Sequence, residues 1–560
     1  MLHHIDTRQK IIVMAAVMCG LFLVALDQTI IATALGAITA EFDSFSSLGF
    51  IVTAYMLTST VTVPLAGKLS DMYGRRPILM AGVILFTLAS LISGLAPSMG
   101  ALIAARAIQG IGGGMIMANA FTIVGDLFSV RERGKWQGFI GAVFGIASVV
   151  GPMLGGWLTD GQTFAGITTD WRWTFFINVP IGIIAALVIG RYTPNFKHGS
   201  AKKPDYLGAL FITLALSSLI LAVDNTATVF AGLIDRGLSL QLIQSILIAI
   251  FLMSTAAFIS IERKAAQPIL PLKFFSNKTF SLISMITLLF GAAFLGSILY
   301  LTQFNQQVFG ASASEAGYML LPMMAGMMTA SIGIGQIIAK VGRYKRFILI
   351  GFSLTTIGIF SLLTLTPTSP YWHEAVIMVF VGLGLGTAMP IFTLAIQNEF
   401  EQKDLGAATS SVQLFRGLGS TIGTAVLSGV LTFGILQSIG EPSELSYIQT
   451  LQDSPSSKQL LEDEITADTL LQINSQKSSI RSGATEAITQ SPLPQPAKEA
   501  QIKAFVAQQE EYSEQVLDAF TDSLHDIFLI SASLMLLALL LATRLPDVEL
   551  ANSPDETPGM

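Results

Sequence analysis

The composition of this chain excludes an ordinary soluble protein. It has 560 residues, of which 52% are hydrophobic and only 12% are charged, and its net charge is −6. Soluble domains carry about 25% charged residues, whereas here apolar runs of about 20 residues, long enough to cross a bilayer as helices, recur along most of the length. The single cysteine, Cys19, excludes a disulfide within the chain. We therefore expect an all-α polytopic membrane protein.

Fourteen apolar segments are predicted to span the membrane. Arg8 and Lys10 precede the first segment, which is too long for a signal peptide and has no small-residue cleavage site, so we expect it to be a retained helix. The fourteen segments cover residues 11–34, 46–67, 77–96, 99–123, 137–159, 173–191, 206–223, 239–261, 279–301, 316–339, 347–366, 374–397, 406–435 and 524–543.

A short polar island joins the second and third spans. Residues 67–76 read GKLSDMYGRR, between two apolar runs that carry no charge. A connection this short and this basic predicts a tight cytoplasmic hairpin. Its turn-forming and charged residues include Gly67, Asp71, Gly74, Arg75 and Arg76, to which the family resemblance below assigns a candidate conformational gate.

Basic residues orient the predicted spans. They concentrate in alternate loops, while the short loops of the other set hold only Arg172 and Arg236. Cytoplasmic loops of membrane proteins are enriched in Lys and Arg, so the basic set is predicted to be cytoplasmic, as are both termini. The long segment 436–523 then lies outside, where the charge rule does not apply to a loop of this length.

Three ionisable side chains are predicted to lie inside spans: Asp27, Arg106 and Arg416. Each would cost several kcal/mol in hydrocarbon unless it faces a partner or a cavity. At about 1.5 Å of rise per residue, Asp27 and Arg106 both lie roughly 10 Å below the outer surface, so they are expected to pair. Such a pair is either a proton-linked site or a static contact between helices. Arg416 has no acidic partner in view, and its predicted role is either contact with a substrate or anion, or hydrogen bonding to carbonyls.

The fifth span contains a run of small residues with one proline, GIASVVGPMLGG at 145–156. Small residues allow close helix packing, and Pro152 removes one backbone hydrogen bond. The segment is therefore either a close-packed, kinked helix or, in addition, a seal for the inner-leaflet side in one conformation. The residues concerned are Gly151, Pro152, Gly155 and Gly156.

A pliable apolar cavity is the predicted place for a ligand. Met residues gather in the tenth span, and such side chains accept varied ligands, although gap-filling between helices is their commoner use. The candidate cavity residues are Gln28, Gln109, Gln413, Arg416, Met323 and Met327.

The chain repeats itself at an offset near 270. Three glycines of the fourth span (110, 112 and 114) fall on three of the twelfth (382, 384 and 386), and the polar island falls on residues 335–343 with Ala339 in place of Asp71. Parallel repeats of this kind occur in transporters. The repeat predicts a six-helix bundle over 1–195, two extra helices over 196–277, and a second six-helix bundle over 278–560. The last part carries an extracytoplasmic insertion, 436–523, of which part is expected to be flexible and 497–522 to extend the last span.

No enzyme signature is present in the sequence. There is no phosphate-binding G-x-x-x-x-G-K-[ST] loop and no His/Glu metal pattern in a span, so neither a cofactor nor a metal is expected. If transport is active, an ion gradient must drive it. Asp27 makes a proton the favoured coupling ion, and sodium remains an alternative.

Several of these motifs resemble a known family. The island at 67–77, the segment RAIQG at 106–110 and the segment GPMLGG at 151–156 are similar to motifs of the major facilitator superfamily. The segments ALDQT at 25–29, WRWTFFINVP at 171–180 and QLFR at 413–416 resemble its fourteen-helix drug/proton antiporter branch. The resemblance covers 1–435 and the last span but not the insertion. It implies the major facilitator fold, with two six-helix bundles plus two extra helices.

The resemblance also implies roles for individual residues. Asp27 would be the proton-linked acid and Arg106 its regulator. Asp71, Arg75 and Arg76 would lock the cytoplasmic ends of the two halves. Asp71 would do so at a helix N-terminus, paired with an arginine across the bundle interface.

We therefore expect a proton-coupled multidrug exporter in the cell membrane that works by alternating access and confers drug resistance. Its expected partners are small hydrophobic substrates, protons and the lipid bilayer, with an export accessory protein as a further candidate and no nucleic acid. One alternative is a dedicated exporter of a single metabolite, siderophore or lipid. A second alternative is a membrane sensor that does not transport, against which Asp27 and Arg106 argue.

Overall fold

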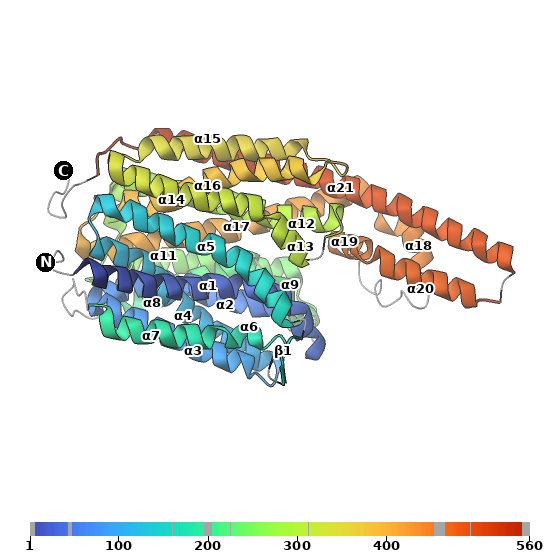
Figure 1. Cartoon of the computed structure of the whole chain (residues 1–560), viewed down its shortest axis with the longest axis horizontal. Helices are drawn as coiled ribbons and strands as arrows, with labels where there is room; N and C mark the ends of the chain where they lie inside the picture. The colour runs from blue at the N-terminus through green and yellow to red at the C-terminus, as the bar shows by residue number, and fades with distance from the viewer. Residues whose placement is uncertain are drawn as a thin grey trace.

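The computed structural model describes residues 6–42, 48–159, 161–164, 166–194, 204–223, 226–311, 313–452, 465–492 and 494–550. Its long helices run side by side along one axis and form a bundle (Figure 1). A helical hairpin projects from one end of the bundle and is formed by α20 (Lys477–Gln490) and the first part of α21 (Gln495–Thr543). Both termini lie at the opposite end (Figure 1). We call the end with the termini the terminal side and the other end the hairpin side.

The first six spans pack together as a first half. In it α1 packs against α5 and α7, while α4 packs against α2 and α3. A two-residue antiparallel pair of strands, with Thr163 opposite Thr168, follows the fifth span on the hairpin side. The elements are α1 (Thr7–Glu41), α2 (Leu48–Tyr73), α3 (Arg75–Gly94), α4 (Met99–Leu127), α5 (Val130–Thr159), β1 (Thr163–Phe164), β2 (Ile167–Thr168), α6 (Trp173–Phe176) and α7 (Asn178–Tyr192).

Two further spanning helices connect the halves. α8 and α11 pack against each other, and α8 also contacts α2 of the first half and α17 of the second. The elements are α8 (Tyr206–Val223), α9 (Thr226–Val229), α10 (Ala231–Ile234), α11 (Leu240–Glu262) and the 3₁₀ turn η3 (Leu272–Ser276).

The last six spans form the second half. In it α16 packs against α14 and α15, and α12 packs against α17 and α21. Its membrane elements are α12 (Lys278–Val308), α13 (Ala313–Met319), α14 (Leu321–Val341), α15 (Lys345–Ser361), the 3₁₀ turn η4 (Leu362–Thr364), α16 (Tyr371–Glu399), the 3₁₀ turn η5 (Gln402–Asp404), α17 (Leu405–Ile439) and α21 (Gln495–Thr543).

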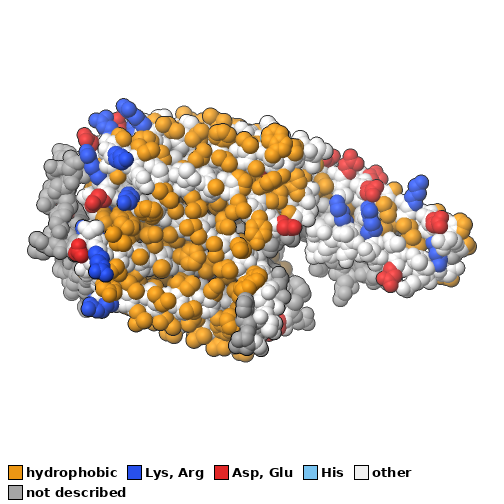
Figure 2. Space-filling view, in the orientation of Figure 1, with side chains coloured by type: hydrophobic (Ala, Val, Ile, Leu, Met, Phe, Trp, Pro, Cys, Tyr) orange, Lys and Arg blue, Asp and Glu red, His pale blue; other side chains and the backbone are white. Residues whose placement is uncertain are grey.

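The prediction of fourteen spans is confirmed, because fourteen helical segments of the described chain are long and apolar enough to cross a membrane. Hydrophobic side chains cover the body of the bundle, whereas Lys and Arg gather at the terminal side and on the hairpin (Figure 2). Many span boundaries differ from the prediction by a few residues, and the tenth span also contains a break. The tenth span is broken at Leu320, and α14 begins at Leu321 with Pro322 in its first turn, where a proline costs no hydrogen bond.

The internal repeat is visible in how the two halves pack. In the first half, Gly110 lies against the backbone of α2 at Tyr55, and Gly112 lies against the backbone of α3 at Gly82. In the second half, Gly382 and Gly384 lie in the same way against the backbones of α14 and α15. Each glycine admits a neighbouring helix that a Cβ atom would push away. The repeated glycines therefore place α4 and α16 equivalently in their halves.

The insertion before the last span is largely helical. It contains the 3₁₀ turn η6 (Pro442–Glu444), α18 (Ser446–Gln452), α19 (Ala467–Ser475) and α20 (Lys477–Gln490). The prediction that 497–522 extends the last span is confirmed, because α21 is one helix of 49 residues. At about 1.5 Å per residue it is roughly 74 Å long, more than twice the bilayer core of about 30 Å.

Much of the insertion is packed rather than loose. Leu470 and Ile473 of α19 are 0% and 1% exposed and belong to the same buried apolar cluster as the spans of the second half. The Tyr512 hydroxyl on α21 donates to the Leu470 carbonyl at 2.8 Å. The segment around α19 is therefore packed, whereas the expectation that part of the insertion is flexible stays a prediction, and residues 453–464 lie outside the described part.

We predict that this packing contributes to folding. Leu470→Ala should lower the free energy of unfolding by about 2–5 kcal/mol, because it leaves a cavity where the side chain was fully buried. The thermal midpoint of the purified protein in detergent measures the change. Thr489→Ala, on the exposed side of α20, is the matched control and should melt like the parent. Equal midpoints for the two variants would contradict a packed insertion.

Candidate functional site

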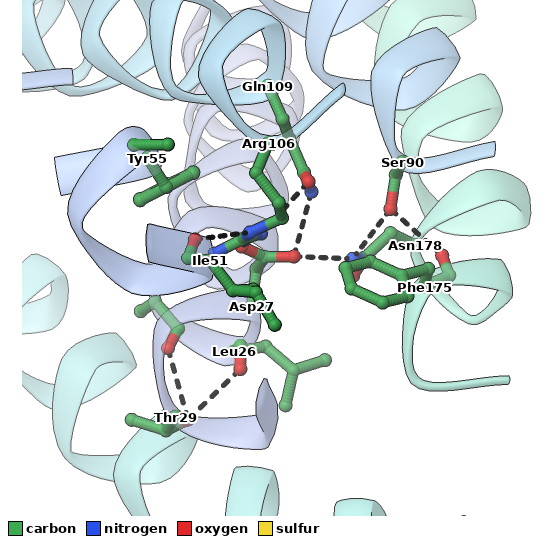
Figure 3. A network of polar contacts seen from close by, with 12 residues as sticks. Leu26, Asp27, Thr29, Ile51, Tyr55, Ser90, Arg106, Gln109, Phe175 and Asn178 are labelled. Atoms are coloured by element: carbon green, nitrogen blue, oxygen red, sulfur yellow. Dashed lines mark hydrogen bonds and ion pairs between the residues drawn. The ribbon is translucent and has the colours of Figure 1, made fainter. Parts of the chain in front are cut away.

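The membrane acid Asp27 and the membrane base Arg106 meet inside the first half. Arg106 Nη1 lies 2.5 Å from Asp27 Oδ2, and both side chains are 1% exposed. α1 supplies the acid and α4 the base (Figure 3). A buried charge is strongly disfavoured without a counter-charge. In this pair each side chain supplies the counter-charge that the other needs.

Neutral amides complete the coordination of the Asp27 carboxylate. Asp27 Oδ1 accepts hydrogen bonds from Gln109 Nε2 at 2.7 Å and from Asn178 Nδ2 at 3.2 Å. Asn178 also donates to Ser90 Oγ at 3.1 Å. Gln109 Oε1 in turn accepts from Arg106 Nη1 at 2.9 Å. The ion pair therefore sits in a closed polar network built from α1, α3, α4 and α7 (Figure 3).

Aromatic rings surround the Arg106 guanidinium. Its Cζ atom lies 4.4 Å from the centre of the Tyr55 ring and 5.8 Å from that of Phe175. Arg106 Nε donates to the Ile51 carbonyl at 3.4 Å. Cation–π contacts of this kind stabilise the charge without fixing it to one partner. These contacts surround Arg106 on the side away from Asp27 with groups that favour a cation.

Four residues of this site are not predicted from the sequence: Asn178, Ser90, Tyr55 and Phe175. A signal was present for two of them, because Phe175 and Asn178 belong to the segment WRWTFFINVP at 171–180. In the structure that segment places one aromatic ring and one amide against the ion pair.

The same segment anchors the far end of α1. Glu41 accepts hydrogen bonds from Arg172 Nη2 at 2.6 Å and from the Trp171 indole at 2.6 Å. The hydrogen bond from Arg172 lowers the pKa of Glu41 below its usual range, so this contact persists as the pH falls through that range. The helix that carries Asp27 is thus tied to the helix that carries Asn178.

The small-residue segment of the fifth span packs α5 onto α1. Gly151 and Gly155 lie directly against Thr29 and Thr33, and Thr29 Oγ1 donates to the Ala147 carbonyl at 3.0 Å. Pro152 lies inside α5, and Gly156, near its hairpin-side end, is half-buried. This contact is within the first half, toward the hairpin side, next to Asp27. The interpretation that the segment seals the inner-leaflet side in one conformation stays a prediction.

The proposed cavity residues fall into different places. Gln109 belongs to the Asp27 network, and Gln28 is exposed. Met323 and Met327 are 1% and 4% exposed, and their backbones pack against Gly382 and Gly386 of α16. Both belong to the large buried apolar cluster that includes the core of the second half, and the Met327 methyl group also approaches Gly145 of α5 in the first half.

Asp71 links the two halves at the terminal side. Its Oδ1 accepts from the backbone N–H of Gly406 at 3.0 Å, and its Oδ2 from that of Ala407 at 2.9 Å. Gly406 and Ala407 belong to the first turn of α17, which has 35 residues. The Asp71 carboxylate of the first half therefore caps a helix of the second half. Free N–H groups and the helix dipole both favour an anion at this position.

Arg75 holds Asp71 in place from within the first half. Its guanidinium pairs with Asp71 Oδ1 at 2.6 Å and with Asp126 Oδ2 at 2.7 Å, and the side chain is fully buried. The expected arginine across the interface is therefore wrong, since the group across the interface is backbone N–H. Arg76 donates to the Gly190 carbonyl of α7, a contact that stays within the first half. Gly74 turns the chain at φ 104°.

A second link between the halves was missed in the sequence. Arg133, at the start of α5, is 3% exposed and donates from Nη1 to the Gln397 carbonyl of α16 at 3.0 Å. In the sequence it was only one cation of a basic loop. Gln397 Nε2 in turn donates to the Phe121 carbonyl of α4 at 3.0 Å. The terminal side is thus closed by several polar contacts between the halves.

The closure is asymmetric although the backbone contacts repeat. Gly67 lies against the Gly406 carbonyl, and its counterpart Gly335 lies against the Gly134 carbonyl. The second crossing has Ala339 where the first has Asp71. At the second crossing, residues 547–550, which we call the C-terminal tail, provide polar contacts with both halves.

The tail reaches both halves at that crossing. Arg131 of α5 pairs with Glu549 at 3.0 Å, and the Leu550 N–H donates to the Gly342 carbonyl at 2.8 Å. Arg343 lies 3.4 Å from Asp547. One crossing is therefore held by a buried carboxylate and the other by an acidic tail.

The prediction of three ionisable residues in the spans is incomplete, because a further acid, Glu374, lies within α16. It is 0% exposed, in the first turn on the hairpin side. Residue 374 is the first residue of the predicted span 374–397, so the apolar pattern alone does not reveal it as a buried membrane acid. It faces Asn305 of α12. Within the described ranges, no group of three or more His, Cys, Asp or Glu residues is arranged to hold a metal ion.

Comparison with known proteins identifies relatives over most of the chain. The profile of the Major Facilitator Superfamily matches residues 17–424. The multidrug transporter protein MdtP of Bacillus subtilis is 37% identical over 423 residues, covering 76% of this chain and 75% of its own length. Multidrug resistance protein 3 of the same organism is 34% identical over 462 residues, covering 79% and 87% respectively.

A solved structure shows the same fold. The proton:xylose symporter XylE, solved with 6-bromo-6-deoxy-D-glucose, superposes with a TM-score of 0.57 over 78% of this chain and 91% of its own. The two sequences are 15% identical, so this similarity concerns the fold alone.

We predict that Asp71 holds the terminal side closed. Replacing it with Asn removes the charge from two hydrogen bonds, each worth about 1.5–3 kcal/mol to a charged group. Ser410, which is 1% exposed and lies against Gly67, reports on the opening. In a Cys19→Ser, Ser410→Cys background, Asp71→Asn should raise the rate of maleimide labelling about tenfold. Asp404→Asn, near the same helix end, is the control, and equal labelling rates in both would contradict the role of Asp71.

Proposed function

The chain belongs to the major facilitator superfamily, and from that premise we propose that it exports hydrophobic drugs or other toxic compounds across the cell membrane in exchange for protons. The relatives named as multidrug transporters support the drug-efflux part of the proposal. The observation that carries proton coupling is the buried Asp27–Arg106 pair at 2.5 Å. The two six-helix halves would act as the moving units, with 196–277 as the linking pair.

The terminal side is proposed to face the cytoplasm. Lys and Arg side chains gather there, while the body between that side and the hairpin is covered by hydrophobic side chains (Figure 2). An excess of basic residues is typical of the cytoplasmic face. Both termini would then be cytoplasmic and the hairpin extracytoplasmic. The exposed hairpin is also the surface that an export accessory protein would meet.

In this orientation the structure corresponds to the state that is closed toward the cytoplasm. The contacts of Asp71 with α17 and of Arg133 with Gln397 hold that closure. To admit a compound from the cytoplasm or the inner leaflet, these contacts must break and the halves must rock apart there. Alternating access is the motion that does this in transporters built from two repeats.

Asp27 is proposed to couple this motion to protons. In the state described, its two oxygens accept three hydrogen bonds, two from amides and one from Arg106. A proton on Asp27 would remove the charge that holds Arg106, which could then turn within the Tyr55 and Phe175 rings. A compound that binds where the released Arg106 lies would push the guanidinium back onto Asp27, and because Arg106 stabilises the charged carboxylate, the proton would then be released. Proton and substrate would therefore bind in alternation, as antiport requires.

We predict that Asp27→Asn abolishes proton-driven efflux. Asn cannot carry a proton between the two sides, although it preserves the shape of the side chain and its bonds to the amides. Accumulation of a fluorescent drug in inside-out vesicles under an imposed pH gradient measures the effect, and the expected loss is to the level of empty vesicles.

The matched control is Asp526→Asn, which removes an exposed carboxylate on α21 and should transport normally. Full transport by Asp27→Asn would sink the coupling role. A panel of unrelated compounds, tested with and without an uncoupler, would separate multidrug efflux from a dedicated exporter, which moves one compound, and from a sensor, which moves none.

A further inference from the structure

Arg416 is a cation in the middle of the membrane region for which the described residues provide no counter-charge. It lies 11 residues into α17, about 17 Å from the terminal end of that helix and close to the middle of a bilayer core of about 30 Å. No Asp or Glu of the described chain lies within ion-pair distance of its guanidinium. An uncompensated charge at this depth is costly, so a functional reason for it is the default hypothesis.

The surroundings of Arg416 are soft and apolar. Its Nη1 lies 2.9 Å from Met389 Sδ, a weak acceptor, and its Cζ atom lies 6.0 Å from the centre of the Phe144 ring. Met328 of α14 packs against Gly145, the residue after Phe144, and so lies at the same interface between the halves. No carbonyl hydrogen bond of this guanidinium is found among the described residues. The structural alternative, carbonyl bonding, therefore has no support.

The position of Arg416 is between the two halves. Phe144 belongs to α5 of the first half, whereas Met389 and Arg416 belong to α16 and α17 of the second. The side chain keeps partial exposure there. Gln413, one turn earlier on the same face of α17, is buried with a side-chain oxygen that lacks a partner. Binding sites in transporters of two repeats lie at this depth and at this interface.

The other charges of the interior do not neutralise Arg416. Asp27 is occupied by Arg106, and Asp71 and Asp126 are occupied by Arg75 at the terminal side. Glu374 lies 15 residues from Met389 along α16, about 22 Å toward the hairpin side. The space around Arg416 is consequently positive.

We propose that Arg416 makes this transporter select amphiphilic organic anions, with one carboxylate or similar group on an apolar aromatic body. The guanidinium would hold the anion through charge-assisted hydrogen bonds, while Phe144, Met389 and Met328 would pack against the apolar body. Organic cations of the same shape would be repelled. This inference rests on the proposed export function, because it names the substrate class of that function.

A matched series of probes tests the charge preference directly. Pyrenebutyric acid, pyrenebutanol and pyrenebutylamine share one aromatic body and carry a negative, neutral and positive group at pH 7. Their affinities for the purified full-length protein in nanodiscs of neutral lipid are measured by fluorescence, without any proton gradient. We expect the acid to bind about tenfold more tightly than the alcohol, and the amine to bind most weakly. Equal affinities of acid and alcohol for the unmutated protein would overturn the proposal.

Variants separate recognition from a structural role. Arg416→Gln should weaken binding of the acid about tenfold and leave the alcohol unchanged, whereas Arg416→Lys should keep part of the preference. Arg236→Gln, an exposed cation in a distant loop, should change nothing. Equal weakening of all three probes by Arg416→Gln would indicate a structural role and overturn the proposal. Because the comparison on the unmutated protein needs no variant, it remains decisive if Arg416→Gln does not fold.

One further comparison identifies whether the bound anion is a lipid or a soluble compound. A second one separates the test of anion binding from the test of proton coupling. If phosphatidylglycerol added to the nanodiscs competes with the acid, the natural anion is a lipid headgroup. If it does not compete, the natural anion is a soluble compound. Both outcomes retain an anion site. The binding test uses no gradient, so loss of proton-driven transport with intact charge preference would refute the coupling and not the anion site.

Discussion

The cost of charge in a membrane governs the organisation of this protein. Hydrocarbon cannot solvate an ion, so each buried charge needs a partner supplied by the fold. Asp27 has Arg106, and Asp71 and Asp126 share Arg75. These pairs tie together helices that are distant in sequence. They also create places where adding one proton or moving one arginine changes which helices are held together.

The two repeats provide the same backbone contacts but different chemistry. Both glycine crossings bring a helix of one half against a helix of the other, which suits a rocking motion. The carboxylate of Asp71 is present at one crossing only, and the acidic tail with Glu549 occupies the other. A buried bond to helix N–H groups is strong and depends on geometry, whereas an exposed ion pair is weak and screened by salt. The first crossing is therefore the one on which closure depends.

The sequence was sufficient for the spans, the repeat and the meeting of Asp27 with Arg106, because apolar length, glycine spacing and helix rise are local quantities. The sequence was insufficient to predict the contacts in which the partner of a charged side chain is a neutral group. Asn178 lies in the segment WRWTFFINVP, but that pattern does not show which of its residues contacts Asp27, because the contact depends on how α6 and α7 turn back toward α1. The target of Asp71 is backbone, which no side-chain pattern reveals. Glu374 was missed because a shift of a few residues in a span boundary decides whether an acid counts as buried.

Substrate and proton are proposed to bind in alternation through Asp27. Proton release tests this most directly, by adding a non-titrating transported compound to the purified protein in weakly buffered detergent with a pH indicator. The account predicts release of up to about one proton per bound molecule, and no release from Asp27→Asn at matched occupancy. Equal release from both proteins, or none from the unmutated protein over the whole pH range in which it transports, would contradict it.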